Sequence, residues 1–397
     1  MNDSRHSHAA AGFSLLEMLI AAALVALVMI GLLQLLDGAA RVSRIQNDMA
    51  QMTETLRFTV EEMVRTMRMA GTGGLPLLAP GSGGALTVLA VGVQDNVAAG
   101  AYTVTDSSGR TWSARPGTDV LTIRGVIGSE LYDLSGATQI TGYTGHGDTA
   151  FNVRLTERSP FTAGRIQPLP AAVSAGTPLL FTLLWELPVV VGTGQVRFFS
   201  KYNIGVVSAN ASATGTAPDR VLDLMVDTVD NQYQAILDLN EGGSFEPFQQ
   251  NYVITAGFLD DLVYFVSTND DGEPALFLWQ PSDNTVLELV DHIWQLQVAL
   301  GCDVNPSDGR LTEVGLAAND DEWFFNHPGD IAPTAEQVLM LQEVRVSLTG
   351  RTAHPDLQWN DVPELPENAP AVTGADRSFR YRSHSVRVTL RSHPPLL

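Results

Sequence analysis

One carboxylate stands alone in the most apolar part of the chain. Glu17 is the single charged residue of residues 13–36, which read FSLLEMLIAAALVALVMIGLLQLL. A carboxylate at the centre of a bilayer costs about 2.5–3.5 kcal/mol on insertion scales, so an acid in such a segment is functional by default. Glu17 therefore needs a partner, and a plain membrane anchor supplies none.

A second candidate for chemistry is an acidic turn later in the chain. Residues 303–309 read DVNPSDG and are followed by Glu313. Their oxygen atoms suit Ca²⁺, although the spacing departs by one residue from the D-x-[DN]-x-[DN]-G pattern of calcium loops. The alternative is a short acidic turn that water simply solvates. The candidate calcium ligands are Asp303, Asn305, Asp308 and Glu313.

Motifs of catalysis and nucleotide binding are missing from the sequence. It has no G-x-S-x-G, no H-E-x-x-H and no Walker A pattern. Cys302 is the only cysteine, which excludes an intramolecular disulfide framework and a Cys-rich zinc site, and we expect it to be a small buried residue. We predict that the protein is not an enzyme and has no small-molecule substrate. Apart from the calcium ion considered above, we predict no cofactor.

The charge is strongly acidic and unevenly distributed. The formal net charge is -21, and residues 219–343 hold 24 Asp and Glu against two Arg. Because phosphate neutralisation needs clustered basic residues, we expect no nucleic-acid partner. Basic residues gather instead near the C-terminus, where we expect them to face solvent or an acidic region of another subunit. They are Arg377, Arg380, Arg382, Arg387 and Arg391.

Residues 13–36 are long enough to cross a membrane. The 19 uncharged residues 18–36 extend ~28 Å as a helix, close to the ~30 Å hydrocarbon core. A secretory signal peptide is the competing interpretation, with Gly38-Ala39-Ala40 as a weak cleavage site, but its apolar core would span only ~7–15 residues. We predict one transmembrane helix.

An apolar stripe continues the helix beyond the membrane. Its members are spaced three or four residues apart with charged residues between them, which predicts an amphipathic helix over 37–70. Six glycines between residues 71 and 84 then predict a Gly-rich linker. The stripe consists of Val42, Ile45, Met49, Met52, Leu56, Val60, Met63, Met67 and Ala70.

Residues 85–397 have the pattern of a β-rich globular domain. Short runs rich in β-branched and aromatic residues lie between turn residues, and NDDG at 269–272 predicts an antiparallel hairpin. In the last run Val386, Val388 and Leu390 should face the core, while Arg387, Thr389 and Arg391 face outward. Four prolines predict an exposed loop over 353–376. The predicted strands are 86–93, 119–125, 151–155, 178–183, 262–266, 275–279, 343–348 and 385–390.

The residues around Glu17 resemble a known processing signal. Gly12-Phe13-Ser14-Leu15-Leu16-Glu17 is similar to the prepilin motif of type IV pilins and type II secretion pseudopilins. The resemblance implies cleavage after Gly12 by a prepilin peptidase, methylation of the new N-terminus at Phe13, and a short polar leader over 1–12. A positive amine at a helix N-terminus is disfavoured by the helix dipole, so Glu17 of a neighbouring subunit would neutralise it during assembly.

The order of later blocks resembles the PilW family of type IV pilus assembly proteins. These blocks are RFTVEEMVRTMRMAG at 57–71, DVLTIRG at 119–125, LVDHIWQLQVALGCD at 289–303, EVRVSLTGR at 343–351 and SVRVTLR at 385–391. The resemblance implies an α+β pilin-like fold and a minor pilin near the filament tip that helps to initiate assembly. A J-type pseudopilin of type II secretion shares the N-terminal features and is the alternative. A single-pass adhesin or sensor is the second alternative.

The same resemblance implies partners and a location. The partners would be other minor and major pilins, the prepilin peptidase and the inner membrane. The chain would cross the bacterial inner membrane once with its globular domain in the periplasm, and later form part of a pilus at the cell surface.

Overall fold

A computed structural model describes most of the chain, which divides into two compact units, Met1–Gln51 and Met52–Leu397. Each unit is treated by itself. The described residues are 14–75, 90–141, 150–162, 164–191, 195–227, 253–304, 309–313, 321–334, 337, 340–356, 358–359 and 363–390.

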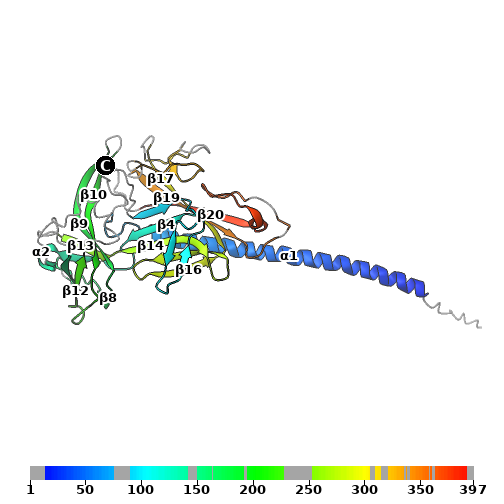
Figure 1. Cartoon of the computed structure of the whole chain (residues 1–397), viewed down its shortest axis with the longest axis horizontal. Helices are drawn as coiled ribbons and strands as arrows, with labels where there is room; N and C mark the ends of the chain where they lie inside the picture. The colour runs from blue at the N-terminus through cyan, green and yellow to red at the C-terminus, as the bar shows by residue number, and fades with distance from the viewer. Residues whose placement is uncertain are drawn as a thin grey trace, which may run out of the picture. The chain divides into compact units, whose positions relative to one another are not determined.

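The predicted N-terminal helix is present as α1, Leu15–Met67 (Figure 1). Within the second unit the predicted stripe is buried from Met52 onward, and Leu56, Val60, Met63 and Met67 are at most 2% exposed. Val42, the first residue of the predicted stripe, is 54% exposed, because the buried part of the helix begins only with the second unit. A helical stripe thus forms one wall of the core of the globular body.

The helix ends in a turn that is built into the body. Gly71 N–H donates to Arg124 O and Val126 N–H donates to Thr72 O, each at 2.9 Å. Gly73 has φ +90°, and a side chain there would collide with Val126. The first residues of the predicted linker are therefore a packed turn, and residues 76–84 lie outside the described residues.

A five-stranded antiparallel sheet contains the predicted hairpin. Asn269 N–H donates to Glu273 O at 2.9 Å and closes the turn between β14 (Asp260–Thr268) and β15 (Pro274–Gln280), which confirms the hairpin. The strands, in spatial order, are β1 (Val91–Gln94), β4 (Val120–Gly125), β14 (Asp260–Thr268), β15 (Pro274–Gln280) and β16 (Thr285–Asp291).

A four-stranded antiparallel sheet holds the C-terminal strand. In β20 (Tyr381–Thr389) Val388 is buried, Val386 is half-buried, and Arg387 and Thr389 are exposed, and the next residue, Leu390, is buried. This confirms the predicted facing of these residues. Arg391 lies outside the described residues. The order is β18 (Trp323–Phe324), β17 (Ile293–Cys302), β19 (Leu341–Arg351) and β20 (Tyr381–Thr389).

Most strands of a seven-stranded antiparallel sheet lie within residues 126–251. The sequence predicted only two strands there, 151–155 and 178–183. Along β7 the buried residues Phe151, Val153 and Leu155 alternate with exposed neighbours, as expected of a sheet with one buried face. The order is β5 (Tyr132–Ser135), β13 (Val253–Phe258), β9 (Pro178–Val191), β10 (Gln195–Val207), β12 (Val221–Asp227), β7 (Ala150–Thr156) and β6 (Ile140–Thr141).

Smaller elements complete the described part of the fold. They are the hairpin of β2 (Thr103–Thr105) and β3 (Thr111–Ser113), the pair β8 (Ala172–Val173) and β11 (Ala211–Ser212), the short helix α2 (Gly136–Gln139) and the 3₁₀ turn η2 (Gly374–Ser378). One long apolar helix followed by a β-rich antiparallel body is the α+β, pilin-like layout that the sequence predicted.

The Pro-rich loop is more firmly attached than predicted. We expected an exposed excursion over 353–376, but Asp356, Asn368 and Val372 are each at least nine-tenths buried. Charged partners explain the attachment, because Arg380 donates to Asp356 at 2.9 Å and Asn368 Nδ2 donates to Asp95 at 2.8 Å.

Two neighbouring carboxyl groups, one buried and one half-buried, make the stability of the body depend on pH. Asp119 is fully buried and accepts backbone N–H groups of Asn96 and Val298, each at 2.7 Å, while its side chain also hydrogen-bonds that of Asp95. Burial raises the pKa of Asp119 well above its ordinary value and also raises that of Asp95. The folded state therefore binds protons more tightly than the unfolded state, so stability falls as pH rises through these raised pKa values.

Asp95→Asn should weaken this pH dependence and stabilise the protein at pH 8 by about 1 kcal/mol, because an amide can donate to the Asp119 carboxylate, whereas two ionised carboxylates have no proton to donate to each other. Urea unfolding of the full chain in detergent between pH 5 and 8 measures both effects. The matched change Asp119→Asn should destabilise at every pH, since its amide N–H₂ would face a backbone N–H donor. An unchanged pH slope in Asp95→Asn would contradict a contribution of the Asp95–Asp119 hydrogen bond to the pH dependence.

Candidate functional site

Helix α1 begins with a reciprocal cap that involves Glu17. Ser14 N–H donates to Glu17 Oε2 at 2.9 Å, and Glu17 N–H donates to Ser14 Oγ at 3.2 Å. This capping box satisfies two of the N–H groups that a helix start leaves unpaired. Gly12 and Phe13 lie outside the described residues, so their predicted roles remain predictions. Both cap residues follow the predicted cut, so cleavage after Gly12 would leave the cap intact.

The first unit presents an apolar surface. Its large side chains are exposed, among them Leu15 at 83%, Leu27 at 70% and Leu33 at 65%. By length and composition α1 could cross a membrane, because its most apolar 18-residue window has a mean hydropathy of 2.7 and none of it is buried. A lipid environment or neighbouring helices would remove this surface from water.

Comparison with protein families identifies the N-terminal apolar segment. Residues 7–33 match the prokaryotic N-terminal methylation motif, a range that includes Gly12, Phe13 and Glu17. The match supports a type IV pilin-like protein. It implies processing by a prepilin peptidase and assembly with pilins in a membrane system, and it is consistent with anchoring in the inner membrane. A pilin-type motif also indicates a structural, non-enzymatic protein. No curated protein and no solved structure matches the chain.

The predicted calcium ligands do not form one described cluster. Asp303 is fully buried and accepts from Gly309 N–H at 2.8 Å and from Gln342 Nε2 at 2.7 Å, so it caps its own turn. Asn305 and Asp308 lie outside the described residues. Among the described residues there is no group of three or more His, Cys, Asp or Glu placed to hold a metal ion. Calcium binding by these four residues remains a prediction.

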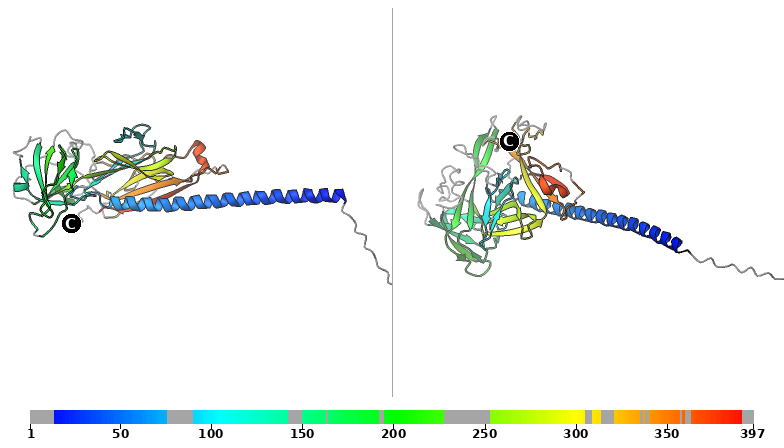
Figure 2. Two further views of the ribbon diagram at one scale, coloured as in Figure 1. Left: turned by 90° about the horizontal axis from the view of Figure 1, so that it is seen from below. Right: turned by 45° about the vertical axis from the view of Figure 1, so that its right-hand side comes forward.

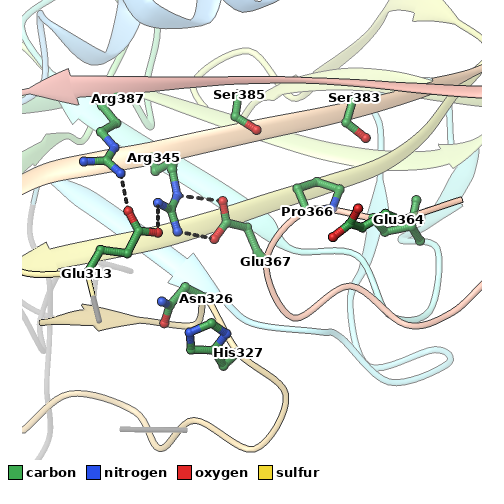
Figure 3. Close-up of a pocket in the computed structure, with 11 residues that line it drawn as sticks. Glu313, Asn326, His327, Arg345, Glu364, Pro366, Glu367, Ser383, Ser385 and Arg387 are labelled. Carbon is green, nitrogen blue, oxygen red and sulfur yellow. Dashed lines mark hydrogen bonds and ion pairs between the residues drawn. The ribbon is translucent and has the colours of Figure 1, made fainter. Parts of the chain in front are cut away.

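The fourth predicted ligand, Glu313, is held by two arginines in a polar pocket of about 650 Å³ (Figure 3). Arg345 donates to Glu313 Oε1 at 2.6 Å, and Arg387 donates to Glu313 Oε2. Burial opposes ionisation of Glu313, but the hydrogen bonds and charges of the two arginines lower its pKa. A carboxylate neutralised in this way is a poor ligand for a cation.

Arg345 links the strand β19 to the Pro-rich loop. Its Nε and Nη2 donate to the two oxygens of Glu367 at 2.7 and 2.6 Å, a bidentate pair, and its guanidinium lies 4.4 Å from the centre of the Trp323 ring. Glu367 has φ +56°, an uncommon conformation for a residue other than glycine. The pocket is therefore crossed by ion pairs that join segments distant in sequence, and these pairs account for the attachment of the loop.

These contacts add partners for the C-terminal arginines that were not predicted. We expected these side chains to face solvent or an acidic region of another subunit. Arg387 is exposed, as expected, and Arg387 and Arg380 also pair with Glu313 and Asp356 of the same chain. Cys302 is buried as expected. The Ser14 cap was not predicted, although the S-x-x-E spacing before an apolar run is its known signal.

Proposed function

We propose that the protein is a minor pilin of the PilW family, which takes part in type IV pilus assembly near the filament tip as part of an initiating complex. The observation that carries the proposal is the methylation motif at residues 7–33 on the apolar helix α1. The β-rich body of the second unit, much larger than the helix, supports a subunit that contacts other pilins.

The proposed mechanism uses three features of the N-terminal segment. The apolar helix inserts in the inner membrane with the body in the periplasm, and the peptidase cuts after Gly12. The new Phe13 amine of one subunit then pairs with Glu17 of a neighbour, and the helices bundle. The capping box gives Glu17 one defined position at the helix end.

Intact-mass analysis and N-terminal sequencing of the protein from its native membrane test the proposal. We expect a chain that begins with N-methylated Phe13. A chain that still begins at Met1 would refute processing and favour the single-pass adhesin or sensor.

Deletion of the gene in its host separates the two processed alternatives. A minor pilin predicts loss of surface pili with normal protein secretion. Loss of secretion with normal pili would identify the J-type pseudopilin instead.

A further inference from the structure

A groove of about 560 Å³ lies between the C-terminal end of α1 and the C-terminal strand β20. This end of α1, from Met52 onward, and β20 both belong to the second unit, and Figure 2 shows this part of the ribbon from two further sides. Its floor is apolar and its rim is charged. The lining residues are Val60, Glu61, Val64 and Arg65 of α1, Arg68 and Met69 of the turn that follows it, and Val386 of β20.

The groove runs beside an open strand edge. β20 is the last strand of its sheet and pairs only with β19 among the described strands. Thr352 N–H donates to Arg380 O, and Leu390 N–H donates to Gln342 O, so even-numbered residues of β20 point their backbone groups at β19. The register between them is uninterrupted. Ser383, Ser385 and Arg387 therefore turn their backbone N–H and C=O groups toward the open edge.

The rim of the groove is basic. Arg65 near the end of α1 and Arg68 just after it are exposed, and Arg382 is exposed on the same face of β20 as Val386. Glu61 is the only acidic residue in the lining, and the contact of Arg65 with Glu62 is long, at 3.9 Å, between two well-exposed side chains. Such a pair contributes little, so the rim retains its attraction for negative charge.

We propose that an extended, acidic segment of a different subunit adds to β20 as a further strand. Its backbone would pair with the open edge, apolar side chains at alternate positions would enter the groove over Val60, Val64 and Val386, and acidic residues would reach the arginines of the rim. A second copy pairing edge to edge is disfavoured because it would bring together the arginines of two β20 strands. The partner is specified only by an extended backbone with apolar and acidic side chains. The proposal therefore does not depend on cleavage after Gly12.

A peptide with the sequence TVLELVD is a suitable probe. It copies residues 285–291, a strand of this protein whose Leu287 and Leu289 are exposed and whose charges are all acidic. We expect saturable binding of the labelled peptide to the full chain in detergent, measured by fluorescence anisotropy and weakened by salt. The control peptide TVLKLVK keeps the apolar pattern and reverses the charge, so it should bind at least about tenfold more weakly.

Three variants of the full chain locate the binding. Ser385→Pro removes an N–H of the open edge without touching the β19 ladder and should weaken binding about tenfold. Ser385→Ala loses only the side-chain contact with Ser347 and should bind normally. The double change Arg65→Glu and Arg68→Glu reverses the charge of the rim and should abolish tight binding of the acidic peptide.

Other outcomes would overturn the proposal. Equal binding of both peptides, absence of binding, or normal binding by Ser385→Pro would each contradict strand addition at this edge. Self-association of the full chain that is lost in Ser385→Pro and displaced by the peptide would identify a second copy as the occupant, against the assignment to a different subunit.

Discussion

Glu17→Gln should leave the chain in the membrane but reduce its incorporation into filaments by at least about 100-fold. Glutamine can replace glutamate in a capping box, so the start of α1 should still form. A neutral amide cannot neutralise the Phe13 amine of a neighbouring subunit, however, and leaving one charge of a buried pair alone costs about 3–5 kcal/mol. Immunoblots of sheared filaments and of membranes measure incorporation and insertion separately.

A second variant separates the charge of Glu17 from its role in the cap. Ser14→Ala keeps the carboxylate but loses the hydroxyl that accepts Glu17 N–H, a change that costs about 1 kcal/mol of helix stability. We expect only a small loss of incorporation. If Glu17→Gln assembled normally while Ser14→Ala did not, the cap would be the essential feature and the proposed ion pair would be wrong.

Features set by neighbouring residues could be predicted from the sequence. The 3-4 spacing of Met52, Leu56, Val60 and Met63 predicted the buried face of α1, because helical geometry places such residues on one side. The turn at 269–272 predicted the hairpin of β14 and β15 because its strands are adjacent in sequence. The cap at the start of α1 is equally local, since it spans only Ser14 to Glu17, and its S-x-x-E signal was present in the sequence although the cap was not predicted.

Features that join distant segments could not be predicted. β13 pairs with β9 and β5, which precede it by many residues, and no local pattern specifies such partners. The same limit applies to charges. The sequence showed that Glu313 and Arg387 carry opposite charges, but not that the fold brings them together. Glu313 was therefore considered as a calcium ligand, and Arg387 was expected to face solvent or a different subunit.

Gly125→Ala should destabilise the body by about 1–3 kcal/mol, because it would force the end of α1 away from β4. A Cβ at this position would lie 2.8 Å from Met69 O and 2.8 Å from Thr72 Oγ1. Met69 O cannot move freely, since Thr72 Oγ1 donates to it at 2.7 Å and the following turn is bonded to the strand. Urea unfolding of the full chain in detergent measures the loss.

Gly92→Ala is the matched control for Gly125→Ala. It adds the same methyl group to the neighbouring strand β1, but there the nearest atom, Thr122 Cβ, is 3.4 Å away. With that contact the change should be nearly neutral, or slightly stabilising through the lower entropy of the unfolded chain. Faster hydrogen exchange at Gly71 and Val126 in Gly125→Ala alone would locate the damage at the turn after α1, where their N–H groups bond. Equal stability of the two variants would show that β4 tolerates a side chain beneath the helix end, and the close approach would then not hold the helix to the body.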